Sequence, residues 1–171
     1  MTLSEFEQYI RDWAVNTLSL ADDKVILSHG TGPRPKGQYA ILNIVTVAKL
    51  GEDVREETRE LSGDIRADYR GPRKIMTSIN IYRDATTQKM INLKSSLDRI
   101  ITQDYFNGLN IGIVEQSDIR RVPEQIGKAW EDRTQCDFFF HAVFDDVDQN
   151  IGEIKQIEVT NEINGETIIV L

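Results

Sequence analysis

The side chains that most often carry out catalysis are scarce in this sequence. There are two histidines, His29 in a Gly/Pro-rich segment and His141 in an apolar run, and one cysteine, Cys136. A zinc site needs three or four ligands at suitable spacing, and neither histidine has such partners. Cys136 and His141 are five residues apart, so on a strand their side chains point to opposite faces and cannot act as nucleophile and base. We therefore predict no catalytic site and no metal site, and expect Cys136 to be a small buried hydrophobe.

Two further segments have features of a ligand site. Residues 28–37, SHGTGPRPKG, lack the G-x-x-x-x-G-K-[ST] pattern, and their prolines remove backbone donors that a phosphate cradle uses. A calcium-binding site is suggested by three aspartates, Asp145, Asp146 and Asp148. The glycine and the terminal glutamate of an EF-hand are absent at the required positions. We interpret the first segment as a turn-rich entry to a strand and the second as a solvated turn. No cofactor is predicted.

Length and charge narrow the class of protein. A chain of 171 residues favours one domain, residues 1–171, because it buries about 70% of the surface that its unfolded form exposes. The net charge of −8 opposes sequence-specific DNA binding, since phosphates repel an acidic domain. Acidity suits solubility, and it also suits a surface past which DNA must slide. No apolar stretch approaches the ~20 residues of a membrane span, and the amino terminus has no signal core, so we expect synthesis in a reducing cytoplasm.

Periodicity predicts two main helices. Apolar residues recur at spacings of three and four in Leu3–Leu18, and Thr2 and Glu5 have the spacing of a capping box. A second helix is expected over Ala85–Ile101, with Asp84 placed to cap it.

Strands are expected at four places. Two runs are apolar at consecutive positions, which predicts strands covered on both faces. They are Tyr39–Leu50 and, within the longer strand candidate Trp130–Asp146, its second half from Cys136 to Phe144. Lys74–Tyr82 places Ile75, Thr77, Ile79 and Ile81 on one face, and Asn110–Val114 is a shorter strand.

Two segments are expected to leave the body of the fold. Residues 51–70 are highly charged and form either a long loop or an extended hairpin. In residues 154–171, Asn164-Gly165 predicts a two-residue hairpin that pairs Val159 with Val170. The predicted fold is therefore α/β of the α+β type, with a mixed, mostly antiparallel sheet, two main helices, the charged loop or hairpin and a C-terminal hairpin.

Three sequence blocks carry a resemblance to a known family. They are PRPKGQYAILNI, SINIYRDAT and GKAWEDRTQCDFFFHAVF. In their order and spacing, over roughly Val25 to Val159, the chain resembles the tail-terminator and neck proteins that connect head to tail in tailed bacteriophages. The family often shows a glycine where this chain has Arg83 or Asp84.

The resemblance implies a structural virion protein with no catalysis and no cofactor. Such proteins are small α/β domains that form a ring, typically a hexamer, at the head-proximal end of the tail. The ring ends tube growth and joins tail to neck. The implied partners are further copies of the chain, the tail tube protein, a neck or connector protein and, in contractile phages, the tail sheath. DNA passes through the channel without sequence-specific binding, and no membrane is involved.

The residues expected at oligomer or partner interfaces lie in three places. Arg34 and Tyr39 stand at the entry to the first strand, and Glu131 and Arg133 form the aromatic-Glu-x-Arg group. The others belong to the charged segment: Glu56, Glu57, Arg59 and Glu60. We expect Glu131 and Arg133, two apart on one strand face, to hold an ion-pair network within the fold or between subunits. The alternative is an exposed surface pair worth at most about 1 kcal/mol.

Three other functions are compatible with the same residues. The chain could be another tail subunit, for tube completion or the baseplate, and its position in the assembly would decide. An enzyme with an unrecognised site requires a pocket of perturbed acids or bases, for example around His141. A small binding module unrelated to phages would be monomeric or dimeric.

Overall fold

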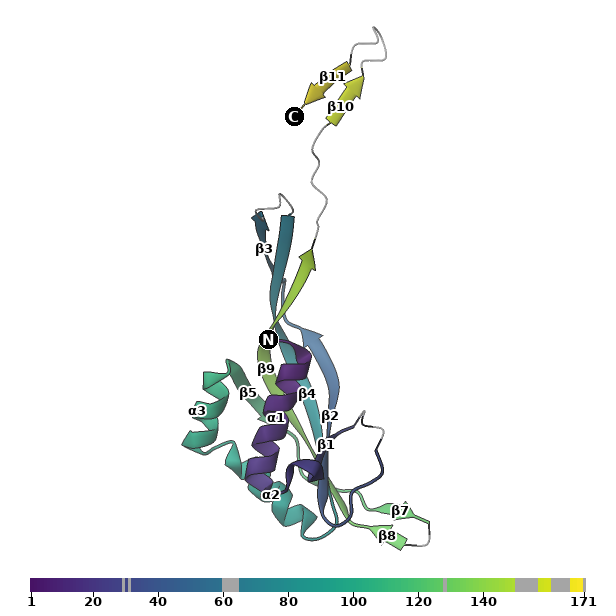
Figure 1. Ribbon diagram of the computed structural model, residues 1–171. Coiled ribbons are helices and arrows are strands. Elements are labelled where there is room, and N and C mark those ends of the chain that lie inside the picture. The colour runs from purple at the N-terminus through teal and green to yellow at the C-terminus, as the bar shows by residue number, and fades with distance from the viewer. Residues whose placement is uncertain are drawn as a thin grey trace. The chain divides into compact units, whose positions relative to one another are not determined.

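The computed structural model describes residues 1–28, 30, 32–59, 65–127, 129–149, 157–160 and 167–170 (Figure 1). These residues form three α-helices, one 3-10 helix and eleven strands. The helices are α1 (Leu3–Leu18), η1 (Asp22–Lys24), α2 (Thr86–Ser96) and α3 (Ile100–Gly108). The strands are β1 (Val25–Leu27), β2 (Tyr39–Lys49), β3 (Val54–Arg59), β4 (Ile65–Tyr82), β5 (Ile111–Gln116), β6 (Arg120–Arg121), β7 (Glu124–Ile126), β8 (Ala129–Glu131), β9 (Arg133–Gln149), β10 (Ile157–Thr160) and β11 (Thr167–Val170).

The chain divides into two compact units. The first unit comprises residues 1–53 and 70–145, and the second comprises residues 54–69 and 146–171. The main sheet has seven strands in the order β1-β2-β4-β9-β5, with β3 paired to β4 and β6 paired to β9. β2 is antiparallel to β4, and β9 is antiparallel to β5 and β6, whereas β1 is parallel to β2. This mixed, mostly antiparallel α/β arrangement confirms the predicted fold class.

Helix α1 begins and ends at the predicted residues, because its local signals agree with its packing. The Thr2 hydroxyl accepts a hydrogen bond from the Glu5 amide at 3.3 Å, and the Glu5 carboxylate accepts one from the Thr2 amide at 2.7 Å. This reciprocal capping box satisfies two amides that the helix itself leaves free. The apolar stripe is buried and comprises Phe6, Ile10, Trp13, Ala14 and Leu18.

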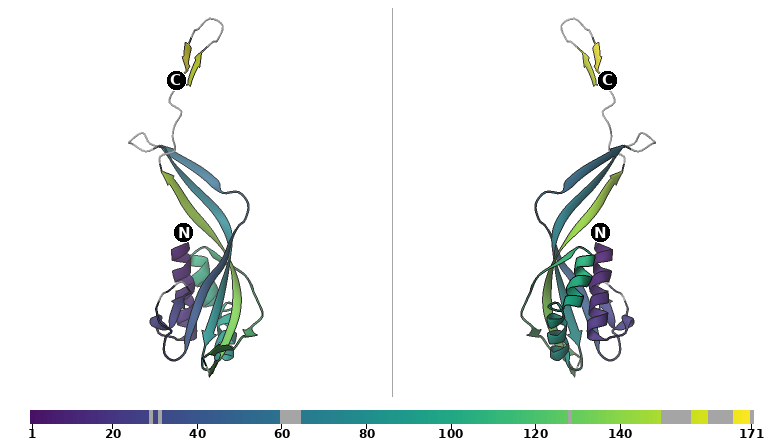
Figure 2. Two further views of the ribbon diagram at one scale, coloured as in Figure 1. Left: turned by 90° about the vertical axis from the view of Figure 1, so that its right-hand side faces the viewer. Right: turned by 90° about the vertical axis from the view of Figure 1, so that its left-hand side faces the viewer.

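The hydrophobic core of the first unit lies between the helices and one face of the sheet (Figures 1 and 2). Ile75, Ile79 and Ile81 of β4 are fully buried on this face, as the period-two pattern predicted. Trp13 of α1 meets Phe138 edge-on at a centroid distance of 5.5 Å. Edge-to-face aromatic pairs of this kind contribute about 1 kcal/mol of stability beyond that gained by burying their apolar area.

The prediction of one helix over residues 85–101 is wrong in two respects. The segment forms α2 and α3, separated by Leu97–Arg99, and the N-cap of α2 is Ala85, which makes no side-chain cap bond. Arg83, Asp84 and Ala85 have φ angles of 61°, 36° and 48°. The helix begins after three consecutive left-handed residues with Ala85 as its N-cap, so Asp84 is not the capping residue. Glycine adopts this conformation at least cost.

The expectation that two strands are covered on both faces is also wrong. In β2, Val45 and Val47 are 44% and 45% exposed, and in β9 His141 and Val143 are exposed. All three helices cover the same face of the sheet, so consecutive apolar residues necessarily place some side chains on the uncovered face (Figure 2). Cys136 is buried as predicted, and burial raises the pKa of its thiol.

Within the charged segment of residues 51–70, the described residues form paired strands, which is the hairpin of the two predicted alternatives. β3 pairs with β4, whose 18 residues extend well beyond the predicted strand of Lys74–Tyr82. At the junction of β2 and β3, the Arg73 guanidinium donates to both carboxylate oxygens of Asp53 at 2.6 and 3.0 Å. Lys49 lies 3.2 Å from the same carboxylate.

Two predictions for the C-terminal part need correction. β10 and β11 form a separate two-stranded sheet in which Val159 pairs with Ile168, and not with Val170. A two-residue Asn164-Gly165 loop would pair Val159 with Val170, so the observed pairing is shifted by two residues. Asp145, Asp146 and Asp148 lie on β9 and not in a turn, because β9 continues to Gln149.

Candidate functional site

The outstanding polar feature of the first unit is a group of five charged side chains, which we call the arginine cluster. Its members are Arg34, Arg83, Glu124, Glu131 and Arg133. Arg34 donates to Glu131 at 3.0 Å and to Glu124 at 2.9 Å. Arg83 donates to the second oxygen of Glu131, and Arg133 lies 3.8 Å from Glu124. The cluster joins the loop before β2 and the end of β4 to the consecutive strands β7, β8 and β9.

The register of the β7–β8 hairpin explains why Arg34 is needed. Glu124 and Glu131 are directly opposed in this hairpin. Two like charges at opposed positions destabilise an antiparallel pair. Arg34 places one guanidinium nitrogen on each carboxylate, which turns the repulsion into two charge-assisted hydrogen bonds. The loop before β2 is thereby tied to the hairpin.

Glu131 is the buried centre of the cluster. Its side chain is only 7% exposed, whereas Arg34 and Arg83 are 48% and 35% exposed. Burying a carboxylate costs free energy unless the group is paired and hydrogen-bonded, and here both oxygens accept from a guanidinium. The arrangement leaves neither oxygen free to act as a base.

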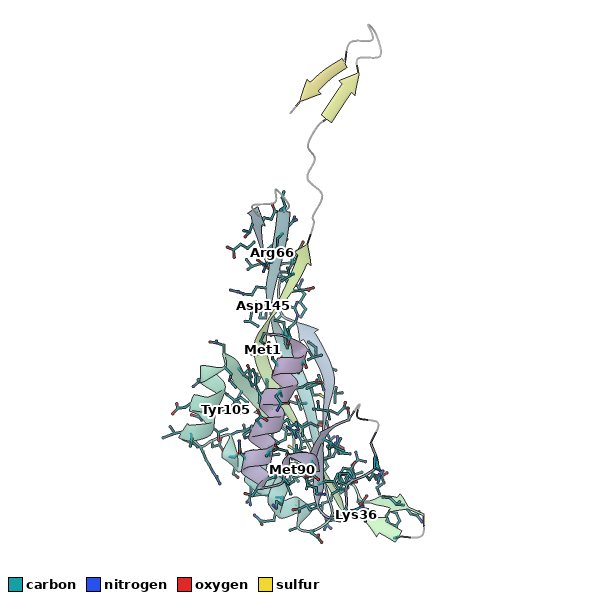
Figure 3. The ribbon with its side chains drawn as sticks, viewed as in Figure 1. Met1, Lys36, Arg66, Met90, Tyr105 and Asp145 are labelled. Atoms are coloured by element: carbon teal, nitrogen blue, oxygen red, sulfur yellow. The ribbon has the colours of Figure 1, made fainter. Side chains whose placement is uncertain are left out.

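Arg83 also holds the loop that precedes β2. Its guanidinium donates to the carbonyl oxygens of Pro35 at 3.0 Å and Gly37 at 3.1 Å. Its backbone amide donates to the Asp132 carbonyl at 2.9 Å. In Figure 3, Lys36 marks this loop beside the β7–β8 hairpin. One residue in a left-handed conformation therefore connects the end of β4, the loop and the base of the hairpin.

Two tyrosines form the apolar part of the site. The rings of Tyr39 and Tyr82 stack at a centroid distance of 4.6 Å with 1° between their planes. Arginines cover them: Arg83 lies 5.3 Å from the Tyr39 centroid and Arg133 lies 5.5 Å from that of Tyr82. Burial raises the pKa of both phenols, so both stay neutral. Within the part of the chain that the structure describes, the buried Tyr39 hydroxyl has no hydrogen-bond partner.

The cluster continues along the helix-free face of the sheet through polar pairs. Arg133 donates twice to the Asn80 side chain, at 2.9 and 3.0 Å. One step further, Gln135 donates to Ser78 at 2.9 Å. Satisfied polar pairs of this kind make a rigid surface, because each group would lose a partner if the strands shifted.

Half of the predicted site residues come together here. Four of them lie in or beside the cluster: Arg34, Tyr39, Glu131 and Arg133. Glu131 and Arg133 belong to different strands and are linked indirectly, because Arg34 binds Glu131 and Glu124, and Glu124 pairs with Arg133. The ion pairs of the cluster described here connect residues of one chain.

The other four predicted residues lie elsewhere. Glu56, Glu57 and Arg59 are on β3 in the second unit, where Glu57 pairs with Arg55, and Glu60 lies outside the described residues. Sequence reasoning missed Tyr82, Arg83 and Glu124. Tyr82 and Arg83 adjoin the predicted strand end, but nothing in the local sequence singles out Glu124.

The chemistry of the site is structural. Its carboxylates are neutralised by arginines, its phenols are protonated, and its arginines are held by fixed acceptors. Among the described residues, no group of three His, Cys, Asp or Glu side chains could hold a metal ion. Such a site fixes the position of the β7–β8 hairpin, which is a structural and not a catalytic role.

Comparison with known protein families agrees with this class. The sequence matches the model of the phage neck terminator protein family over residues 4–167, and the chain belongs to that family. This is a family of structural virion proteins and not of enzymes, which confirms the resemblance drawn from the three sequence blocks. A search of curated proteins found no match. None of the helices in the described part of the chain is long and apolar enough to cross a membrane.

Proposed function

We propose that the protein forms a ring of six copies at the head-proximal end of a phage tail, where it ends tube growth and joins the tail to the neck. The observation that carries this proposal is the family match over residues 4–167, which implies a structural role in completing the tail. The place of action is then the tail or neck of the virion.

The surface of the first unit supports assembly into a ring. A closed ring needs two different, complementary patches on each subunit. Trp130 is 69% exposed on the β7–β8 hairpin, and Ile100 and Ile101 are 76% and 78% exposed on α3. Large apolar side chains at such exposure are typical of protein contacts, particularly when polar residues surround them.

The proposed partners follow from the position of the ring. They are further copies of the chain, the tail tube protein, a neck or connector protein and, in a contractile tail, the sheath. The net charge of −8 suits a channel through which DNA passes without being retained.

The predicted interface residues have two roles in this proposal. Arg34, Tyr39, Glu131 and Arg133 act indirectly, by fixing the β7–β8 hairpin. Glu56, Glu57, Arg59 and Glu60 contact a neighbouring subunit directly. Reversing the charges of Glu56 and Glu57 therefore lowers ring yield without lowering the stability of the first unit.

The experiment that tests the proposal measures the mass of the purified protein by light scattering, followed by negative-stain imaging. A ring has six times the 19.6 kDa mass of one chain and a central hole. The same imaging with purified tail tubes locates the protein on one tube end. Binding at the tip end instead would assign it to the baseplate, and a monomer that binds no tube would contradict the proposal.

A further inference from the structure

We propose that Trp130 of one copy inserts into a groove between α1 and α3 of the next copy, and that this contact closes the ring. This inference rests on the proposed function, because it names the contact by which the ring forms. It is carried by two exposed apolar features of the first unit, which remain open to solvent among the described residues.

The first feature is the apolar tip, formed by Trp130 and Ile126 on the β7–β8 hairpin. Their exposed fractions are 69% and 41%. The arginine cluster holds the base of this hairpin through Arg34, which binds one carboxylate on each strand. A contact side chain on a hairpin that is already fixed loses little conformational entropy when it binds. Tryptophan is also among the residues that contribute most to protein interfaces.

The second feature is the helix groove, a cavity of about 320 Å³ on the helical face. Its lining residues are Trp13, Asn16, Thr17, Ser96, Arg99, Ile101, Thr102 and Tyr105. Trp13 is only 4% exposed, and its indole donates to Ser96 at 3.0 Å, so its position is fixed. Ile101 is 78% exposed, which leaves an apolar wall open to solvent.

Charge also favours this pairing. Asp84 lines the same surface hollow as the apolar tip, and Arg99 lines the helix groove. Neither side chain forms an ion pair with any residue that the structure describes. An acidic group beside the tip and a basic group beside the groove attract each other when two copies dock, and repel two tips or two grooves.

The positions of the two features require a second copy. Figure 1 shows α3 and the β7–β8 hairpin on different sides of the first unit, so one copy cannot fill its own groove. A tip on one side and a groove on another make a head-to-tail contact, which repeats around an axis until it closes.

The test uses two variants of the full chain, Trp130→Asp and Ile101→Asp. Both side chains are largely exposed, so both variants are expected to keep the circular dichroism spectrum and melting temperature of the wild type. Neither forms rings, with or without tail tubes. Mixed in equal amounts, they form a heterodimer of twice 19.6 kDa and no ring, because one intact tip meets one intact groove. The control is Val114→Asp, a substitution at a 41% exposed valine on β5, which still forms rings.

A charge exchange provides a second measurement. Asp84→Lys and Arg99→Glu each lower the ring yield at low salt at least tenfold, and the double variant restores it. If the wild type forms rings and the Trp130→Asp and Ile101→Asp variants do so equally well, this contact is wrong while the proposed function stands. If the wild type forms rings neither alone nor on tube ends, the proposed function fails and the contact fails with it.

Discussion

At the scale of single residues, Glu131 is the buried centre of this surface. It is the least exposed charge of the arginine cluster and accepts hydrogen bonds from Arg34 and Arg83. The aromatic-Glu-x-Arg group is recognisable in the sequence, but the sequence does not show that Glu131 is buried. The partner arginines lie 97 and 48 positions away in the chain, so only the fold brings them together.

We predict that Glu131→Gln lowers the free energy of unfolding by about 2 kcal/mol, because two charge-assisted hydrogen bonds are lost and an amide nitrogen then faces a guanidinium. Urea unfolding followed by circular dichroism measures the change. The matched control is Glu57→Gln, whose side chain is 52% exposed beside Arg55 and whose loss costs at most about 0.5 kcal/mol. Equal effects of the two substitutions would show that Glu131 is an ordinary surface residue.

At the scale of elements, the long strand β4 depends on Gly71. At this position the side chain of Asp53 approaches the backbone, and a Cβ added to Gly71 would lie 1.6 Å from its carboxylate oxygen. The approach allows Asp53 to bind Arg73 and Lys49 at the junction of β2 and β3. A glycine in a strand often marks such a close approach, although the sequence does not show which side chain makes it.

Replacing this glycine is expected to weaken the junction. Gly71→Ala displaces the Asp53 carboxylate from Arg73 and lowers the free energy of unfolding by about 1–2 kcal/mol, measured by thermal or urea unfolding. Gly108→Ala is the control, because nothing lies within 4 Å of the added Cβ at this helix end. It leaves stability unchanged or raises it, since alanine favours helix more than glycine does. A Gly71→Ala protein as stable as the Gly108→Ala protein would contradict the assigned role of Asp53.

At the scale of the whole molecule, carboxylates held by hydrogen bonds make stability depend on pH. The pKa values of four carboxyl groups are lowered, because each accepts hydrogen bonds. Glu5 accepts from the Thr2 backbone, and Asp53 accepts from Arg73. Asp132 accepts from Thr86 and Arg121, and Asp145 accepts from the N-terminal ammonium and Arg70. A carboxyl group with a lower pKa when folded stabilises the protein above its unfolded pKa. That stability is lost as the pH falls through the folded pKa.

The free energy of unfolding should therefore be nearly constant between pH 7 and pH 5 and fall below about pH 4. Asp132→Asn removes one contribution, so it is less stable than the wild type at pH 7. The difference between the two proteins narrows as the pH falls through the lowered pKa of Asp132, because the wild-type carboxyl group then becomes protonated as well. Urea unfolding at several pH values measures both curves. A difference that does not change with pH would show that Asp132 stabilises the fold without its charge.

The sequence by itself determined the local structure. Helix α1 and its capping box, the buried face of β4, the buried Cys136 and the fold class follow from periodicity and from short-range hydrogen bonds, which act between residues close in the chain. The order of three short blocks was enough to indicate the family. These features need no knowledge of which elements pack together.

Only the tertiary structure decided how the elements face each other. Whether a face of the sheet is covered depends on which side the helices pack, and both β2 and β9 carry apolar residues on both sides. The division of α2 from α3, the register of β10 with β11 and the pairing of Arg34 with Glu124, 90 residues away, likewise depend on long-range contacts. The arginine cluster, the apolar tip and the helix groove therefore became visible only in the folded chain.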